Sequence, residues 1–490
     1  MAGIGFELKK LFQKRGVLAM VRAYGYAGMI CTGPMLLGIL LILGIMLISR
    51  EFGAVKPDRD LMVCMITYAL LSSLKVTSFF SMVTTRFIAD KFYEEKLDQV
   101  MPSLYGSCSI MMVLGGLAYA IFLYFSGITP GMQLLNLLLF EELLVVWSEI
   151  NYLTAIKDYR GILLTFGLSL LVAFLAALLL LTLHVEVKLA LLSAVCLGYG
   201  IMVIWYLILL LKYFPRGKGS IFSFLRWFDL YKPLAFTGLA LDIGLFAHLL
   251  VAWASTIGQR VHGLFYGAPE HDVPALFAFL TILITTVNFV TSIEVNFYPK
   301  YKDYYSQFNG NGSIKDIHQS EHEMLTVLEH ELLYTARKQL YTTALAVSVG
   351  VLFIHMLPLG FTDEMDTYFR VLCIGYGMYA LANMMLLILL YFTDYRGAMW
   401  SAVTFAATST VASVILAGID ERYIGFGFMI GSGLFCFIVI VRLGFFTKKL
   451  PFHILSTQPV VAQRTTGVFH VLCDWLERRQ TRETIQKKKA

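Results

Sequence analysis

Apolar stretches long enough to cross a lipid bilayer recur along almost the whole chain. A membrane-spanning helix needs about twenty mostly apolar residues, whereas a membrane β-barrel shows alternating ten-residue segments, a pattern this sequence lacks. Of the 490 residues, 58% are hydrophobic and 15% are charged, against roughly a quarter charged in soluble domains. The sequence therefore predicts an all-α integral membrane protein. We place twelve spans near residues 26–48, 61–85, 103–126, 133–156, 162–183, 188–212, 232–255, 274–297, 339–360, 368–392, 398–418 and 423–446.

One four-residue phrase, Asp-Tyr-Arg-Gly, occurs twice, at Asp158–Gly161 and at Asp394–Gly397. The two copies stand at the ends of the fourth and the tenth predicted span, which are equivalent places in two sets of six spans. This placement indicates an ancient duplication. We expect two pseudo-symmetric six-helix lobes around a central cavity, related by an axis along the membrane normal.

The predicted domain organisation follows from this repeat and from the polar segments between the spans. It consists of a cytoplasmic amphipathic N-terminal helix at residues 1–22, an N-lobe at 23–213, a basic cytoplasmic linker at 214–231, a C-lobe at 232–447 with a cytoplasmic helical insertion at 299–338, and a basic cytoplasmic tail at 448–490. Basic residues concentrate in the loops on one side of the predicted membrane. The positive-inside rule therefore places both termini in the cytoplasm. The formal net charge of +6 is explained by these loops and tails, so we expect no nucleic-acid partner.

Ionisable residues inside the predicted spans are the first candidates for function. Such a residue costs about 2.5–3.5 kcal/mol at the bilayer centre unless it is paired or hydrated. We expect these side chains to line a polar transport path or to couple transport to an ion; the alternative is that they form structural ion pairs within one lobe. The candidates are Lys75, Glu141, Glu149, Asp242 and His248.

Two aromatic residues deep in the predicted spans, Trp147 and Tyr379, are candidates for stacking on sugar rings. Tryptophan and tyrosine are also enriched in membrane proteins simply as anchors at the lipid–water interface. Both interpretations stay open for these two positions.

The charged residues of the repeated phrase suggest a cytoplasmic latch. Asp158 with Arg160, and Asp394 with Arg396, stand where two spans leave the membrane, where they could pair with neighbouring loops. The alternative is ordinary helix-end chemistry, with an arginine that reaches the interface and a glycine that ends a helix.

We expect no metal and no cofactor. The seven cysteines are scattered without metal-ligand or redox spacing. His318 and His322 are four residues apart, as zinc ligands can be, but a solvated helix face explains them equally well. There is no glycine-rich phosphate loop and no plausible nucleophilic triad in the sequence, so we expect a protein that is not an enzyme.

Three segments near the N-terminus closely resemble the Pel exopolysaccharide transporter family (PelG). These are the opening string from Met1 to Leu11, the segment Tyr24–Gly28, and Thr32-Gly33-Pro34; the twelve-span layout and the repeated phrase are also similar to that family. The resemblance implies the fold of the multidrug/oligosaccharidyl-lipid/polysaccharide exporter superfamily. Functional residues on spans one and seven of that superfamily lend weight to Asp242 here.

The resemblance also implies a function and partners. The implied function is export of a hexosamine-rich, Pel-like exopolysaccharide across the bacterial cytoplasmic (inner) membrane during its synthesis, for a biofilm matrix. The implied partners are a cytosolic glycosyltransferase and other membrane subunits of the synthase complex, including a cyclic di-GMP sensor. Two alternatives remain: a cation-coupled small-molecule or multidrug antiporter, or a lipid-linked oligosaccharide flippase, of the same fold; and a non-transporting scaffold of a polysaccharide synthase.

Overall fold

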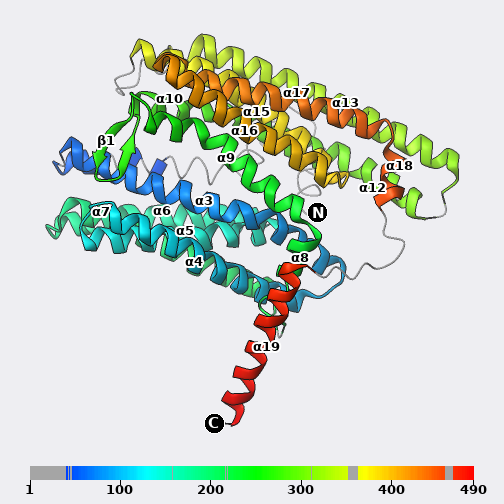
Figure 1. Cartoon of the computed structure of the whole chain (residues 1–490), viewed down its shortest axis with the longest axis horizontal. Helices are drawn as coiled ribbons and strands as arrows, with labels where there is room; N and C mark the ends of the chain where they lie inside the picture. The colour runs from blue at the N-terminus through cyan, green and yellow to red at the C-terminus, as the bar shows by residue number, and fades with distance from the viewer. Residues whose placement is uncertain are drawn as a thin grey trace. The chain divides into compact units, whose positions relative to one another are not determined.

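The computed structural model describes residues 40–489, apart from residues 42, 45, 46, 54, 157, 216, 218, 311, 351, 353–361 and 458–466. The predicted N-terminal helix at residues 1–22, the family-like segments and most of the first predicted span lie outside the described residues. The chain forms two compact units (Figure 1). The N-terminal unit comprises the described residues within Met35–Ile243, Gln259–Gly267 and Pro459–Ala490, and the C-terminal unit those within Gly244–Gly258 and Ala268–Gln458.

The N-terminal unit is built from long helices that run side by side. In chain order these are α3 (Lys56–Tyr93), α4 (Val100–Phe125), α5 (Pro130–Ile156), α6 (Tyr159–Thr182) and α7 (Val187–Tyr213), followed by the short α8 (Leu225–Leu230), the first half of α9 (Lys232–Ala254) and the C-terminal α19 (Val468–Lys489). Helix α5 packs against α3, α4 and α7, and α6 packs against α7. A helix rises about 1.5 Å per residue, so the 38-residue α3 extends well past a hydrocarbon layer of about 30 Å.

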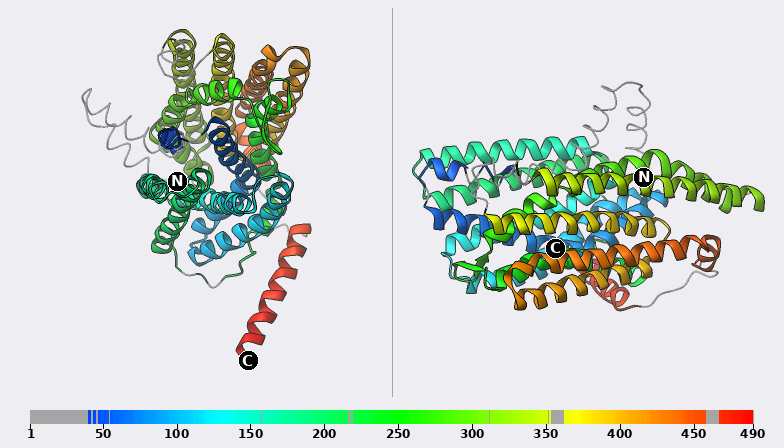
Figure 2. Two further views of the ribbon diagram at one scale, coloured as in Figure 1. Left: turned by 90° about the vertical axis from the view of Figure 1, so that its left-hand side faces the viewer. Right: turned by 90° about the horizontal axis from the view of Figure 1, so that it is seen from above.

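The C-terminal unit contains the second half of α9 and the helices that follow it. These are α10 (Pro269–Phe279), α11 (Ile282–Ser292), the π-helical η2 (Ile293–Phe297), α12 (Tyr298–Asn309), α13 (Ile314–Leu345), the π-helical η3 (Ala346–Gly350), α15 (Asp363–Tyr391), α16 (Tyr395–Ile419), the short η4 (Glu421–Tyr423), α17 (Ile424–Thr447) and α18 (Leu450–Thr457). Helix α15 is the most buried of the candidate spans, and it packs against α10 and α17 (Figure 2).

Among the described residues, ten helices are long and apolar enough to cross a membrane. The two remaining predicted spans, the first and the ninth, fall largely or partly outside the described part of the chain. Two boundaries differ from expectation. The eighth span, predicted as one helix at 274–297, breaks into α10 and α11. Helix α13 runs without interruption past residue 338, where the insertion was predicted to end and the ninth span to begin, and it packs against α11 there.

A two-stranded hairpin adds to the predicted all-helical fold. Strands β1 (Gln259–His262) and β2 (Phe265–Gly267) pair antiparallel, with Gly263 in a left-handed conformation at the turn. The hydroxyl of Tyr68 on α3 donates to the carbonyl of Tyr266 and accepts from its amide, both at 3.1 Å. This exchange fixes the hairpin at one end of α3.

Small residues let α16 and α17 approach closely. Gly427 and Gly431, four residues apart on α17, lie against Ser413 and Ser409 on α16. A Cβ atom on Gly431 would lie 2.6 Å from the Cα atom of Ser409. Stripes of small residues are the usual means of close helix association in lipid, where no hydrophobic force between helices exists.

We expect the substitution Gly431→Ala to lower the thermal stability of the purified protein. The added methyl group must push α16 away, and overpacking of this kind costs about 1–3 kcal/mol. Gly444→Ala on the same helix is the matched control, because a Cβ atom there meets no described atom within 4 Å. Thermal unfolding in detergent measures both, and equal melting temperatures for the two variants would contradict the close-packing argument.

Candidate functional site

Two charged residues of the N-terminal unit lie on the neighbouring helices α3 and α9. The ammonium group of Lys75 and the carboxylate of Asp242 interact electrostatically. Gly238, one turn before Asp242, lies against the backbone carbonyl of Ser78, one turn after Lys75, so the two helices run antiparallel in close contact here. Oδ2 of Asp242 has no hydrogen-bond partner among the described residues. Asp242 is buried, so this oxygen is enclosed without a partner in the described part of the chain.

Three carboxylates of α5 point at neighbouring helices of the same unit. Glu141 lies against Gly116 on α4, and Glu142 lies against Gly200 on α7, where an added Cβ atom would be 3.1 Å from its Oε1 atom. Glu149 is only 1% exposed. Each of the three has an oxygen, Oε2, without a hydrogen-bond partner among the described residues. An ionised carboxylate in such surroundings is costly, so each needs a proton, a cation or water.

Glu149 is enclosed more completely than Glu141. It is close enough to Cys108 on α4 and to Tyr206 on α7 to interact with both electrostatically. Glu141 also faces α4, eight residues further along that helix, at Gly116. The two predicted path carboxylates therefore lie against the same neighbouring helix, inside one unit.

The two predicted stacking residues are already engaged. The indole of Trp147 donates to Oγ of Ser73 on α3 at 3.1 Å. The ring of Tyr379, 8% exposed, lies among three phenylalanine rings with centroids 5.6–6.5 Å away. In this conformation Tyr379 offers no open ring face to a sugar.

His248 belongs to a buried chain of polar groups in the C-terminal unit. Its Nε2 is 3.1 Å from the hydroxyl of Tyr376 on α15, and its Nδ1 is 3.3 Å from Nε2 of His271 on α10. Both histidines are fully buried. Nδ1 of His271 in turn lies 3.7 Å from Oδ1 of Asp272, whose other oxygen accepts from the indole of Trp253. His271 and Asp272 are not among the residues predicted from the sequence; the signal available was a histidine at the start of an apolar stretch.

The repeated phrase forms the same helix cap twice. Asp158 and Asp394 precede α6 and α16 with backbone angles of φ −83°, ψ 64° and φ −78°, ψ 64°. Each carboxylate accepts from the amide three residues on, that of Gly161 at 2.9 Å and that of Gly397 at 3.1 Å. Side-chain capping of this kind satisfies amides that the first helical turn leaves free.

The two caps differ in their second partner. Asp158 accepts from the hydroxyl of Tyr213 on α7 at 3.2 Å, whereas Asp394 forms a two-bond ion pair with Arg442 on α17, at 2.6 and 2.9 Å. Arg442 was not predicted from the sequence, because nothing in its apolar helix indicates an ion pair with Asp394, 48 residues away. Arg396 is exposed. In both units the aspartate joins the capped helix to the helix that follows it.

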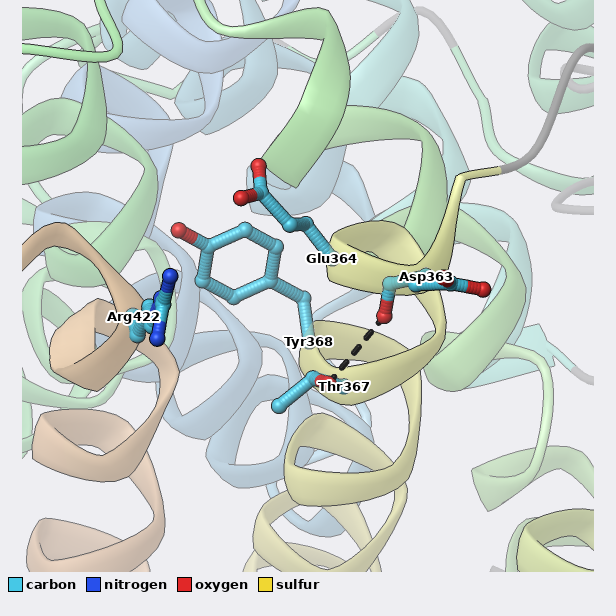
Figure 3. Close-up of a pocket in the computed structure, with 5 residues that line it drawn as sticks. All are labelled: Asp363, Glu364, Thr367, Tyr368 and Arg422. Atoms are coloured by element: carbon cyan, nitrogen blue, oxygen red, sulfur yellow. Dashed lines mark hydrogen bonds between the residues drawn. The ribbon is translucent and has the colours of Figure 1, made fainter.

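A cavity of about 330 Å³ opens at the first turn of α15. Figure 3 shows its lining, in which the ring of Tyr368 stands between the carboxylate of Glu364 and the guanidinium of Arg422. Thr367 donates to the backbone carbonyl of Asp363, the remaining lining residue. A cavity of this size with an aromatic wall and a few charged groups is typical of a site for a small polar ligand.

Comparisons with solved structures show the fold. A transporter of the MOP superfamily from Pyrococcus furiosus superposes with a TM-score of 0.57 at 12% identity, over 92% of this chain and 99% of that one. A MATE transporter in the straight conformation gives 0.56 at 12% identity over 92% and 99%, and the eukaryotic MATE transporter AtDTX14 gives 0.57 at 12% over 93% and 98%. The predicted fold class, an all-helical multi-pass membrane protein with the fold of these transporters, is confirmed.

No curated protein sequence matches the chain. The family model of PelG, described as "Putative exopolysaccharide Exporter (EPS-E)", matches residues 1–455 and so covers all but the C-terminal tail. The chain belongs to the PelG family of exopolysaccharide exporters.

Proposed function

We propose that this protein carries a hexosamine-rich exopolysaccharide outward across the bacterial cytoplasmic membrane while the polymer is being made, for a biofilm matrix. Both termini lie in the cytoplasm in this proposal, and the lobes at residues 23–213 and 232–447 form the two sides of the path. Membership of the exporter family supports the substrate class. The observation that carries the proposal is the electrostatic interaction between Lys75 and Asp242 inside candidate membrane helices, together with the buried Oδ2 of Asp242, which has no hydrogen-bond partner among the described residues.

Weak, repeated binding suits a polymer that must keep moving. Carboxylates accept hydrogen bonds from sugar hydroxyls and attract the ammonium groups of amino sugars. A tight site would hold the chain, so a path needs several modest contacts. Elongation of the polymer can supply the driving force, alone or together with an ion that neutralises Asp242 or Glu141.

The protein requires partners in this proposal, because nothing in it suggests polymer synthesis. A cytosolic glycosyltransferase delivers the growing chain, and other membrane subunits of the synthase, one of them a cyclic di-GMP sensor, control it. Helix α13 offers a docking surface: its first turn is closed by a reciprocal cap between Ser313 and Asp316, and Lys300 of α12 pairs with Glu323 at 2.7 Å. This ion pair raises the pKa of Lys300 and lowers that of Glu323, so both stay charged at neutral pH.

Neutralising the predicted path should reduce export without removing the protein. We expect the double variant Asp242→Asn, Glu141→Gln to lower secreted polymer by about tenfold, equivalent to about 1.4 kcal/mol of barrier. Immunoblots of membranes and an assay of secreted polymer measure assembly and export separately. The matched control Glu95→Gln, Asp98→Asn changes two exposed carboxylates. Unchanged secretion in the first variant would favour the non-transporting scaffold.

The cavity at α15 is a candidate contact point for single sugar units near the outer end of the path. Asp363 and Glu364 supply negative charge, and Tyr368 supplies an apolar ring. We expect purified protein to bind a glucosamine tetramer more tightly than its N-acetylated form, because only the former carries ammonium groups. Calorimetric titration should show that Asp363→Asn, Glu364→Gln abolishes this difference, while Glu51→Gln, an exposed carboxylate elsewhere, retains it. Equal affinities for the two tetramers in the unaltered protein would remove the cavity from the proposal.

The rival function, a cation-coupled antiporter, needs a route for protons. The chain formed by Tyr376, His248 and His271 is the best candidate, but both histidines are fully buried, which denies them direct exchange with water. We therefore expect that the purified protein in liposomes does not exchange ethidium for protons across an imposed pH gradient. Exchange that is lost in His248→Gln, and kept in His184→Gln at an exposed loop position, would establish the rival instead.

A further inference from the structure

The C-terminal helix α19 is anchored to α8, although it lies beyond the part of the chain that the family model matches. Asp229 at the end of α8, 2% exposed in its side chain, accepts from the backbone amide of His470 at 2.8 Å and from its Nδ1 at 3.3 Å. Burial alone would raise the pKa of Asp229, but the hydrogen bonds from His470 hold it below its usual value. The aspartate thus caps the first turn of a helix about 240 residues away in sequence.

Two further contacts complete this anchor. Arg226 of α8 donates to Asp474 at 3.0 Å and to Glu477 at 2.8 Å. Phe228 packs on Phe469 with ring centroids 5.3 Å apart. The first three turns of α19 are therefore held on one face by charge, ring packing and a cap.

The anchored face is not a metal site, although Cys473, Asp474 and Glu477 place ligand atoms within 4.8 Å of one another. Burial raises the pKa of the Cys473 thiol to about 12, so the thiolate that binds metals is scarce at neutral pH. Both carboxylates already accept from Arg226. The cluster belongs to the anchor.

The opposite face of α19 carries large apolar side chains that are exposed. Val468, Val471, Leu472 and Trp475 follow one another at intervals of three, one and three residues, which places them on one side of a helix. They are 78%, 68%, 40% and 51% exposed. Four large apolar side chains in one exposed stripe indicate a surface that is covered when the protein works.

The basic residues of α19 and the direction of this helix relative to α3 to α7 both indicate that lipid covers its apolar face. The helix carries six arginines and lysines against three acidic residues, and its three arginines follow Trp475 in the sequence. Within the N-terminal unit, α19 leaves α8 and crosses the direction of α3 to α7 in both views (Figures 1 and 2). A helix that crosses membrane spans at their ends runs along the membrane surface, and an apolar stripe followed by arginines is the pattern of interfacial helices.

We propose that the apolar face of α19 lies in the headgroup layer of the surrounding membrane and that anionic phospholipids hold it there through the arginines after Trp475. The proposal is independent of what the protein transports. The contacts with α8 hold the first turns of α19 in place, and the lipid holds the rest of that helix. Basic residues near an anionic leaflet each add to such binding, and salt weakens them.

The test uses the fluorescence of Trp475 in the full-length protein, reconstituted into nanodiscs. Emission of the unaltered protein minus that of Trp475→Phe isolates the signal of this one tryptophan. We expect phosphatidylcholine brominated near the headgroup end of its acyl chains to quench this signal. The quenching should be at least about twofold stronger when phosphatidylglycerol is present. The triple variant Arg478→Gln, Arg479→Gln, Arg482→Gln should lose that dependence on lipid charge.

Trp205, whose signal is isolated in the same way with Trp205→Phe, is the control, because it is 44% exposed on a candidate membrane helix and should be quenched whatever the lipid charge. A Trp475 signal quenched by aqueous iodide but not by brominated lipid would overturn the proposal. So would a signal shielded from both quenchers, since a second copy or a partner protein would then cover the stripe. The comparison of lipid compositions in the unaltered protein decides the matter even if the arginine variant does not fold.

Discussion

The hydrocarbon of a bilayer offers no hydrogen-bond partner, and this constraint explains most of the structure. It makes every spanning segment a helix, and it forces each polar side chain in a span to find a place between helices. Glycines provide these places: Gly116 receives the carboxylate of Glu141, and Gly200 that of Glu142. A side chain on either glycine would collide with or crowd the carboxylate. The helices are close where they carry only small residues, and polar groups fit where one helix has no side chain at all.

The repeated phrase forms the same aspartate helix cap in both units, while the second partner of the aspartate differs. Asp158 and Asp394 hold nearly identical backbone angles and cap equivalent helices. Gly397 is tightly enclosed by the carboxylate of Asp394 and the guanidinium of Arg442, so no larger residue fits there. The cap is local and survives a change of neighbour, whereas the second partner, Tyr213 in one case and Arg442 in the other, depends on the following helix. Both copies of the phrase therefore cap a helix and join it to the next one, and the cytoplasmic latch stays a prediction.

Hydropathy was sufficient to predict the helices, since a span of twenty apolar residues has few alternatives. The breaks within helices and the points where helices end were harder to predict from hydropathy. The break at Leu280–Thr281 follows from no strong local signal, and the continuity of α13 across residue 338 depends on packing against α11, through contacts such as that of Lys338 with Asn288 at 2.9 Å. Contacts between residues that are distant in the sequence could not be predicted. The sequence marked His248 as unusual, but it gave no sign that Tyr376, 128 residues away, is its hydrogen-bond partner.

Burial divides the predicted path residues into two groups with different consequences for transport. Glu149 and Tyr379 are enclosed within single units, at 1% and 8% exposure, so a polymer can reach them only if the helices of that unit separate. Separation would break close helix contacts, which is costly in lipid. Lys75 is half-buried, and Asp242, which interacts with it, keeps an unpartnered oxygen. Asp242 is itself only 9% exposed, so a polymer reaches its oxygen only if α3 and α9 also move apart. The physical argument for the proposed path therefore rests on the interaction of Lys75 with Asp242 between α3 and α9, where a buried oxygen lacks a hydrogen-bond partner among the described residues.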